Sequence, residues 1–417
     1  MSSNPTPDPH ATQIGFGQRM QLLRTRRGMS REVLAGLLGR PLSWVKQVEN
    51  GQIHMPKLDM VLAIAEALRV RDLSELTGGQ RMATGLFIGP GHPRLAAVAD
   101  AVNALPGLAR DDRAPSLEHL RARLAAAWTA RHSAPDHREV VGALLPDLIR
   151  DAQLAARQAD TAPERRAAQS ILAQVYFLTQ FFVSYQPDSS LVWRVAERGM
   201  VAAQESEDPH AIGVAAWLAT QAHRDSGAAH YDAADAVVRD VLAFLNPLLP
   251  DAGGPVLAIA GALTFEAGYT AARRGRASEA WSYWDRAGDM ASRLPDGYYH
   301  PVTSFSRAIM GAHAVTVAVE LHAGGESVRQ AARADATTIP SRPRRARHRI
   351  EQARAYQLDG QPDVALATLE QAHAAAPETI RWNGYAKRII LEEYESVQPQ
   401  RRRRAADLAV QVGLLAV

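Results

Sequence analysis

The sequence predicts an all-α protein with a small five-helix domain ahead of a longer array of helices. Hydrophobic residues make up 47% of the chain but aromatic residues only 6%, because alanine is abundant, and alanine with leucine and arginine favours helix over strand. Apolar residues recur at helical spacing along most of the chain. At 417 residues it exceeds what one small core supports, so we expect two or more domains.

Composition excludes several kinds of chemistry. The chain has no cysteine, which rules out disulfides, thiolate metal sites and cysteine nucleophiles. It has no His-Glu-x-x-His or Gly-x-Ser-x-Gly motif and no carboxylate-histidine cluster at ligand spacing, so we expect no enzyme, no cofactor and no bound metal. It also lacks a charged-then-apolar leader and a bilayer-length apolar run, from which we expect a cytoplasmic protein without membrane contact.

Changes in composition divide the chain into four parts. Residues 1–12 are rich in proline and serine without an apolar period, which predicts a disordered tail. Helical patterns fill residues 13–80. Residues 81–115 contain Gly and Pro breaks and predict a linker with one short helix near Leu95–Leu105. We favour a plain connector over a phosphate loop there, because no Gly-Lys-Ser/Thr follows the glycines. Residues 116–417 form a run of amphipathic helices.

Three helices frame the first domain. The first ends at Gly28, and its expected apolar side consists of Phe16, Met20, Leu22 and Leu23. Pro56 opens a later helix whose apolar positions are Leu58, Val61, Leu62, Ala65 and Leu68. A short fifth helix, Asp72–Leu76, completes the domain.

Between these helices, Ser30–Asn50 has the spacing of a helix-turn-helix. Ser30 can cap a helix whose first turn holds Glu32, where the helix dipole favours an acid. Gly39 ends this helix, and Pro41 suits the start of the next one, Leu42–Glu49. The expected inward residues are Leu34, Ala35, Leu37 and Leu38 in the first helix of the pair and Val45 and Val48 in the second. The outward residues of the second, in varying degrees, are Leu42, Ser43, Trp44, Lys46 and Gln47.

The net charge of +3 is too small to indicate a nucleic-acid partner. The local distribution of charge is more informative about such a partner. Between Arg19 and Arg31 the chain has no acid but three further arginines, Arg24, Arg26 and Arg27. This is the positive footprint that phosphates require. Two later basic runs, Pro343–Arg349 and Arg401–Arg404, could form a second nucleic-acid surface. Because no aromatic residues are interleaved for base stacking, we favour solvated helix faces for both.

The second part of the chain carries a weak internal period. The same offsets are occupied by Gly268, Gly275, Ala280, Trp284 and Ala287 in one segment and by Ala353, Gly360, Ala365, Leu369 and Ala372 in another. These are packing positions of the tetratricopeptide repeat, whose helix pairs recur about every 34 residues. Ala280 and Ala365 are 85 residues apart, so the repeats between them must be irregular in length. We therefore predict a tetratricopeptide-like α-solenoid.

On the residues quoted above, Phe16–Leu76 resembles the Cro/C1-type (XRE family) helix-turn-helix domain. With its helical remainder, the chain resembles actinobacterial regulators of that family that carry a tetratricopeptide-like sensor, and its architecture is similar to that of peptide-sensing quorum regulators of Gram-positive bacteria. The resemblance implies double-stranded DNA as a partner, with a recognition helix in the major groove. The residues that it assigns to DNA binding are Arg31, Arg40, Leu42, Ser43, Trp44, Lys46, Gln47 and Asn50.

The chemistry of these side chains agrees with that assignment. Gln47 can donate to and accept from adenine, Lys46 can donate to guanine or phosphate, and Ser43 can bond either. The family usually has Gln in place of Arg31 and a polar residue in place of Leu42, so we expect a phosphate contact from Arg31 and at most a thymine-methyl contact from Leu42. Trp44 is large for its position. It either rests on the sugar-phosphate backbone or packs against the first helix.

A sensor site is expected on the concave side of the solenoid, which the first helix of each pair lines. The candidates by this rule are Phe177, Phe181, Trp217, Gln221, Arg224, Glu266, Tyr269 and Arg273; the alternative is that they pack in the core or face solvent. Peptide-sensing relatives hold a peptide backbone with several asparagine carboxamides, but after the linker this chain has only Asn246 and Asn383. We therefore favour a small-molecule effector or a protein partner, and keep a peptide as the alternative.

Together, these features predict a transcriptional regulator that binds palindromic operators as a homodimer and responds to an effector in its helical domain. The alternative is a protein-interaction scaffold whose repeats bind a partner and whose helix-turn-helix is vestigial. The unusual Leu42 and Trp44 are the features that favour the scaffold.

Overall fold

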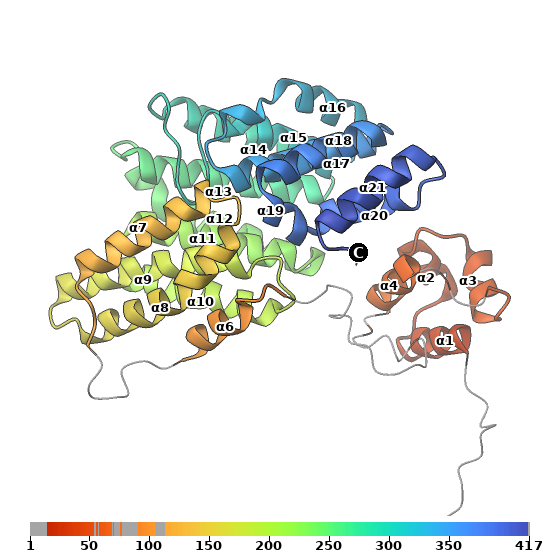
Figure 1. The fold of residues 1–417 in the computed structure, drawn as a ribbon, viewed down its shortest axis with the longest axis horizontal. Coiled ribbons are helices and arrows are strands. Elements are labelled where there is room, and N and C mark those ends of the chain that lie inside the picture. The colour runs from red at the N-terminus through yellow and green to blue at the C-terminus, as the bar shows by residue number, and fades with distance from the viewer. Residues whose placement is uncertain are drawn as a thin grey trace, which may run out of the picture. The chain divides into compact units, whose positions relative to one another are not determined.

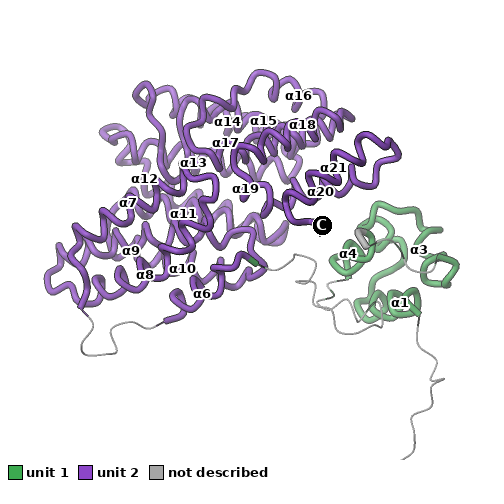
Figure 2. The backbone as a smooth tube through the Cα atoms, in the orientation of Figure 1, with its two compact units in different colours: residues 1–91 green, residues 92–417 purple. Residues whose placement is uncertain are grey.

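The computed structural model describes residues 15–53, 56, 58–68, 70, 76, 91–104 and 113–415. It divides into two compact units, residues 1–91 and residues 92–417 (Figure 2). The described residues form helices and no strand, which confirms the all-α prediction. The predicted tail at residues 1–12 lies outside the described residues, as does the predicted fifth helix Asp72–Leu76 except for Leu76 itself.

The first unit has four described helices: α1 (Phe16–Arg26), α2 (Arg31–Leu37), α3 (Leu42–Glu49) and α4 (Leu58–Ala67) (Figure 1). The start of α2 is as predicted, because the Ser30 hydroxyl accepts a hydrogen bond from the Val33 amide at 3.2 Å. Gly39 has a φ of 60°, a conformation that glycine adopts without strain. It turns the chain between α2 and α3, and the predicted helix-turn-helix is confirmed.

The core of the first unit contains most of the predicted apolar residues. Leu34, Val45 and Val48 are fully buried, but Leu22 is 45% and Leu37 is 61% exposed, so the prediction that these two face inward is wrong. The reason is the direction in which each side chain points. In α1, Met20 and Leu23 lie on one side and Leu22 lies off that side. In α2, Leu34 and Leu38 lie on the inward side, and Leu37 lies beside them. In such short helices, three or four apolar residues are too few to fix a stripe by periodicity alone.

Gly17 sets the distance between α1 and α3. A Cβ atom at this position would lie 1.9 Å from the carbonyl oxygen of Val48, far closer than real contacts allow. The backbone of α1 therefore packs directly on the last turn of α3, and α3 is held at a fixed position against α1.

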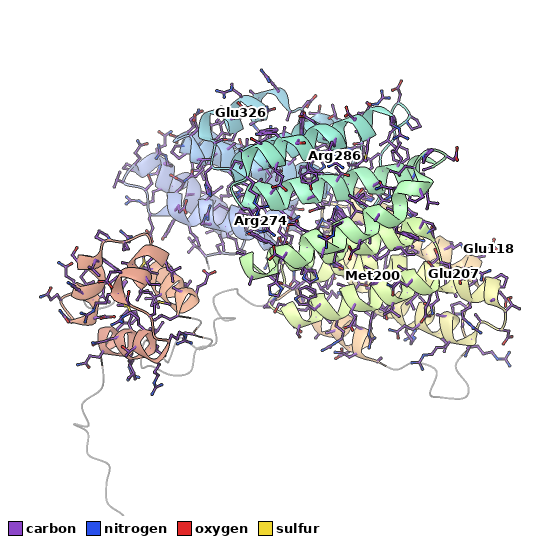
Figure 3. All side chains as sticks on the ribbon, turned by 180° about the vertical axis from the view of Figure 1, so that it is seen from behind. Glu118, Met200, Glu207, Arg274, Arg286 and Glu326 are labelled. Carbon is purple, nitrogen blue, oxygen red and sulfur yellow. The ribbon has the colours of Figure 1, made fainter. Side chains whose placement is uncertain are left out.

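The second unit is an array of antiparallel helices (Figure 1). Its α-helices are α6 (Leu95–Asn103), α7 (Leu117–Ser133), α8 (His137–Gln158), α9 (Ala162–Val183), α10 (Ser189–Glu205), α11 (Pro209–Asp225), α12 (Tyr231–Leu245), α13 (Gly254–Arg273), α14 (Ala277–Ser292), α15 (Ile309–Glu320), α16 (Gly324–Arg333), α17 (Arg342–Leu358), α18 (Pro362–Ala375), α19 (Pro377–Trp382), α20 (Gly384–Tyr394) and α21 (Pro399–Gln411). Short 3-10 turns lie at Ala228–His230, Asn246–Leu248 and Ala336–Thr338. Glu118, Glu207 and Arg286 are among the exposed charged residues of this unit (Figure 3).

The helix pairs α13–α14 and α17–α18 carry the predicted repeat positions. Gly275 and Gly360 have φ angles of 76° and 75° and form the turn inside each pair, where only glycine fits without strain. A Cβ atom on Gly268 would lie 3.1 Å from the Ala280 carbonyl oxygen, and Ala365 is fully buried. The small residues let the two helices of each pair approach closely, as a tetratricopeptide-like pair requires.

Helix α6 belongs to the second unit. It is the short helix expected within the linker at residues 81–115, but Val98 and Val102 are fully buried in the same core as the residues of α8 and α9, and α6 packs on α8. The compact unit therefore begins at His92, because α6 covers an apolar face of α8 that would otherwise be exposed.

The inner helices of the second unit close into a ring. Helices α7, α9, α11, α13, α15 and α17 each contact the next one, and α17 contacts α7. At this closure the Nδ1 atom of His132 lies 2.9 Å from the hydroxyl of Ser341. The Glu378 carboxylate of α19 accepts hydrogen bonds from the amides of Arg138 at 2.5 Å and Glu139 at 3.3 Å, so it caps the positive end of α8. The first and last inner helices of the solenoid are thereby joined.

Candidate nucleic-acid interface and central cavity

One face of α3 is exposed and polar. Ser43, Lys46, Gln47 and Asn50 are all exposed, and their spacing places them on a single helical stripe. Leu42 is half-buried at the start of the helix. The stripe combines an ammonium donor, two carboxamides and a hydroxyl, which are groups able to bond base edges and phosphates. Five of the predicted DNA-binding residues thus lie together.

Trp44 and Arg40 form a separate contact beside this stripe. Trp44 is half-buried and packs against the core of the first unit, and the guanidinium carbon of Arg40 lies 5.7 Å from the centre of its ring. Of the two alternatives for Trp44, this geometry favours packing. The exposed Arg40 is positioned by the indole ring through a cation-π interaction.

Arg31 is part of an ion-pair network that the sequence did not indicate. Its Nε lies 2.5 Å from Glu49 Oε2, and Arg24 Nε lies 2.6 Å from Glu49 Oε1. The Glu49 side chain is fully buried, the Arg24 side chain is 10% exposed and the Arg31 side chain is 31% exposed. Arg24 therefore joins α1 to α3 instead of facing phosphates, whereas the neighbouring Arg26 and Arg27 are exposed.

One sequence signal could have revealed this network. Glu49 is the last residue of α3, where the negative end of the helix dipole disfavours an acidic side chain. An acid in that unfavourable place needs a strong partner, and Arg24 supplies a two-pronged one, with Nη2 donating to Oε2 at 3.1 Å. Arg24 also donates from Nη1 to the Met29 carbonyl oxygen at 2.7 Å, which orders the chain entering α2.

The ring of inner helices in the second unit surrounds a cavity of about 510 Å³. Seven of the eight predicted effector residues line it: Phe181, Trp217, Gln221, Arg224, Glu266, Tyr269 and Arg273. Phe177 does not, because it is 2% exposed and its ring lies against α10, 3.6 Å from where a Cβ atom on Gly199 would be. The prediction that Phe177 faces the sensor surface is therefore wrong. Phe177 lies one helical turn before Phe181 in α9, and its ring packs against α10.

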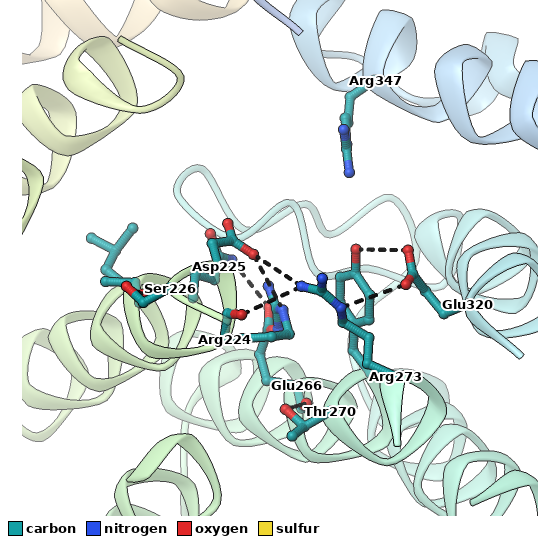
Figure 4. A network of polar contacts seen from close by, with 12 residues as sticks. Arg224, Asp225, Ser226, Glu266, Thr270, Arg273, Glu320 and Arg347 are labelled. Carbon is teal, nitrogen blue, oxygen red and sulfur yellow. Dashed lines mark hydrogen bonds and ion pairs between the residues drawn. The ribbon is translucent and has the colours of Figure 1, made fainter. Parts of the chain in front are cut away.

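Most of the polar residues predicted at this wall bind one another (Figure 4). Glu266 is ion-paired with Arg224, both side chains being 4% exposed, and it accepts a hydrogen bond from Gln221 Nε2 at 3.1 Å. Arg224 also lies over the Tyr269 ring, 4.0 Å from its centre. Burial by itself would lower the pKa of Arg224, but Glu266 and then other neighbours raise it above its ordinary value. The guanidinium is therefore firmly charged.

Arg273 extends this network across the cavity wall. Its Nε lies 3.6 Å from Glu320 Oε2, and its Nη1 lies 3.7 Å from Asp225 Oδ1 (Figure 4). The Tyr269 hydroxyl donates to Glu320 at 3.5 Å. These contacts join α11, α13 and α15, so this part of the wall is built from mutually satisfied charges.

The basic run Pro343–Arg349 contributes to the same cavity. Pro343, Ala346 and His348 are buried in α17, and Arg344 and Arg347 line the cavity, so the prediction of a solvated helix face is wrong for this run. The reason is that α17 is an inner helix of the ring, and its polar side faces the central cavity instead of the outer surface. The sequence pattern of a charged helix face is the same in both situations.

The other basic run, Arg401–Arg404, lies on α21 and matches the predicted solvated face. Arg402 and Arg403 are exposed. The remaining two form ion pairs, Arg401 with Asp363 at 2.8 Å and Arg404 with Glu370 at 2.9 Å, which join α21 to α18.

Two further arginines of the cavity were missed in the sequence. Arg131 lies in the last turn of α7, with its guanidinium carbon 4.9 Å from the centre of the Phe181 ring. Arg138 lies in the first turn of α8 and donates from Nη1 to the Phe182 carbonyl oxygen at 2.5 Å and from Nη2 to the Ser184 carbonyl oxygen at 3.2 Å. Both line the cavity, although no predicted effector residue comes from α7 or α8.

Histidines at the cavity are neutral at physiological pH. Burial, with the charge of Arg131 second, lowers the pKa of His132 to about 4, and burial, with Arg344 second, lowers that of His348 to about 4. The positive charge of the cavity therefore comes from its arginines. Among the described residues no group of three or more His, Asp or Glu side chains could hold a metal ion, and no described helix is long and apolar enough to span a bilayer.

A family model described as a helix-turn-helix domain matches residues 16–76. This match confirms the resemblance expected for Phe16–Leu76 and agrees with the geometry of α2 and α3. The chain thus joins a helix-turn-helix domain, the DNA-binding module of transcription regulators, to an all-helical unit of tetratricopeptide-like pairs.

No curated protein matches the chain. Two solved structures are similar to it at low scores. PlcR of Bacillus thuringiensis, in complex with the peptide PapR7 and DNA, is 10% identical, with 85% of this chain and 99% of that chain covered and a TM-score of 0.27. ComR from S. thermophilus, in complex with DNA and its signalling peptide ComS, is 16% identical, with 68% and 95% covered and a TM-score of 0.18.

Proposed function

We propose that this protein is a sequence-specific transcription regulator that binds palindromic operator DNA as a homodimer. The observation that carries the proposal is the exposed stripe of Ser43, Lys46, Gln47 and Asn50 on α3 of a helix-turn-helix domain. In such domains the second helix enters the major groove, where these side chains reach base edges and phosphates. The exposed Arg40, Arg26 and Arg27 add positive charge for phosphate contacts.

Dimerisation follows from the size of the recognition surface. One module of this size makes too few contacts to select a site in a genome, whereas two modules related by a two-fold axis match the two halves of a palindrome. The second unit supplies the larger surface for such an interface. The expected oligomer is therefore a dimer in solution or on DNA.

The cavity of the second unit is proposed to hold an effector that changes DNA affinity. An effector can do so only by binding more tightly to one arrangement of the two recognition helices than to the other. Because helices from α7 to α20 line the cavity, filling it would shift the packing of helices far apart in the sequence.

Selection of duplex DNA from a random library by the full chain tests DNA recognition. We expect enrichment of an inverted repeat, with an affinity that falls steeply as salt rises. Lys46→Ala and Gln47→Ala should each weaken binding to the selected site by about 10-fold. Lys387→Ala, which removes the same charge from the second unit, is the matched control and should leave affinity unchanged.

The scaffold hypothesis makes the opposite prediction for this experiment. A vestigial helix-turn-helix would enrich no sequence, and its residual DNA binding would be the same in the Gln47→Ala variant and the unaltered protein. Either result would remove sequence-specific DNA binding from the proposal.

A further inference from the structure

Three arginines of the cavity, here called the cluster, form no ion pair with any described residue. Arg131, Arg138 and Arg344 come from α7, α8 and α17; α7 contacts both of the other helices, and it meets α17 where the ring closes at His132 and Ser341. Among the described residues, Arg131 and Arg344 form no ion pair and no hydrogen bond, and Arg131 Nη1, Arg138 Nε and Arg344 Nε are buried nitrogens without an acceptor. Buried donors of this kind normally have partners.

The acids of the cavity wall are already engaged elsewhere. Six arginines line the cavity, but among the described lining residues only Asp225, Glu266 and Glu351 are acidic. Glu266 is paired with Arg224, Asp225 lies near Arg224 and Arg273, and Glu351 is paired with Arg347 and Arg354. No described acid that lines the cavity is therefore left to pair with Arg131, Arg138 or Arg344, and unpaired positive charge is costly in a buried place.

This arrangement changes the pKa values of the guanidinium groups. Burial first, and then the charges of Arg138 and Arg344, lower the pKa of Arg131 to about 10. Burial also lowers the pKa of Arg138 to about 10, although Glu378 acts in the opposite direction. All three remain cationic at neutral pH, and an anion placed among them would relieve their repulsion.

Aromatic side chains lie beside the cluster. The Phe181 ring, which Arg131 covers, has its centre 6.0 Å from that of Trp128 and 6.2 Å from that of Trp217, and all three line the cavity. The volume of about 510 Å³ is within the range of sites for small organic ligands. A charged group and an apolar body can thus be accommodated together.

We propose that the cavity binds a small amphipathic molecule whose oxyanion, a carboxylate or a phosphate, is held by Arg131, Arg138 and Arg344 and whose apolar body lies against Trp128, Phe181 and Trp217. Guanidinium groups match both oxyanions because they donate two parallel hydrogen bonds. The chemical class of this ligand is argued from the cavity. That the ligand is the effector of a regulator rests on the proposed function.

The dye 8-anilinonaphthalene-1-sulfonate, an aromatic oxyanion, tests the cluster in the full chain. We expect Arg131→Gln and Arg344→Gln each to weaken binding of the dye by about 10-fold. The uncharged analogue N-phenyl-1-naphthylamine should bind the variants and the unaltered protein alike. Arg239→Gln on α12, where the side chain is 72% exposed, is the matched control for loss of charge. Unchanged dye affinity in both cluster variants, or an equal loss for the uncharged analogue, would overturn the proposal.

Thermal unfolding separates a binding role from a structural one. Without an anion, Arg131→Gln should raise the melting temperature of the second unit, because it removes repulsion and breaks no ion pair; a structural arginine would lower it. At constant ionic strength, benzoate or phenyl phosphate should raise the melting temperature of the unaltered protein, and the larger shift identifies the preferred oxyanion. Benzyl alcohol acting equally well, or the anion shift persisting in Arg131→Gln, would contradict the proposal.

These measurements use no DNA, so the two proposals can fail separately. If the chain enriches no DNA sequence but still binds anions through these arginines, the proposed regulator is wrong and the ligand class stands. Operator binding with no arginine-dependent anion binding would remove the ligand class alone.

Discussion

At the residue scale, Glu49 is the charge on which the first unit depends. It is fully buried and is held by Arg24 and Arg31, so α1, α2 and α3 are joined at one carboxylate. Removing one member of a buried ion pair leaves the remaining charges uncompensated, and this costs more than the pair contributes relative to an apolar core.

Glu49→Gln should therefore lower the local stability of the first unit by about 3 kcal/mol. Amide hydrogen exchange in α1–α3 of the full chain would then accelerate by roughly 100-fold. Glu66→Gln, which changes an exposed acid on α4, is the control. Equal exchange in the two variants would show that the network contributes little.

His300 provides a second residue-scale test, through pH. It is fully buried, its Nδ1 accepts a hydrogen bond from the Thr303 amide at 3.1 Å, and its Nε2 lies 2.7 Å from His210 Nε2. Burial, with His210 second, lowers the pKa of His300 to about 3. The unfolded chain, where histidine has its ordinary pKa of about 6.5, therefore takes up the proton first as the pH falls.

The stability that neutral His300 contributes is complete above pH 6.5 and is lost as the pH falls from there towards 3. We expect this residue to account for about 1.4 kcal/mol of the unfolding free energy of the second unit per pH unit in that window. Denaturation of the full chain between pH 6.5 and 4.5 should show a shallower pH dependence for His300→Gln. His119→Gln, at an exposed position of α7, should keep the original slope; a common slope for both variants would refute the assignment.

At the element scale, the contact between α1 and α3 places the recognition helix. Its closest point is Gly17 against the Val48 carbonyl oxygen, where a methyl group cannot be accommodated without moving one helix. The angle between α1 and α3 therefore depends on the absence of a side chain.

Gly17→Ala should destabilise the first unit by about 1–3 kcal/mol through overpacking and weaken binding to the selected operator. Gly36→Ala on α2 is the matched control, because no heavy atom lies within 4 Å of the added Cβ and alanine favours helix. Hydrogen exchange of α1–α3 and operator titration report the two effects. A Gly17→Ala protein that exchanges as slowly as the Gly36→Ala protein would show that α1 can shift freely.

At the scale of the second unit, closure of the ring creates the cavity. Glu378 of α19 caps α8 by accepting from two of its first amides, and Ser341 meets His132 at the start of α17. The first and last parts of this unit are thereby joined, although more than 200 residues separate the bonded partners.

Glu378→Ala should loosen this closure by about 1–2 kcal/mol, the usual effect of losing a helix cap. We expect faster hydrogen exchange at the start of α8 and in α19. Glu197→Ala, at an exposed position of α10, is the control. Unchanged exchange at the start of α8 would show that other contacts hold the ring closed.

Local features of the whole chain could be predicted from its sequence because they depend on neighbours within one or two helical turns. The Ser30 cap, the turn at Gly39, the repeat positions around Gly268 and Ala365 and the polar stripe of α3 are all set by helical period and by residue chemistry. The same logic placed Phe181 and Arg224 on inner helices, since the first helix of each pair lines the concave side.

The tertiary structure alone decided how distant charges meet. Arg344 faces the cavity because of how the helix pairs are rotated relative to one another along the whole unit. Glu49 pairs with Arg24 only when α1 packs against α3. Helical periodicity records which side of a helix is polar, but not what lies opposite that side. The sequence by itself therefore determined the helices and the polar stripe of α3. Packing between helices that are far apart in the sequence determined the buried ion pairs and the charge of the cavity.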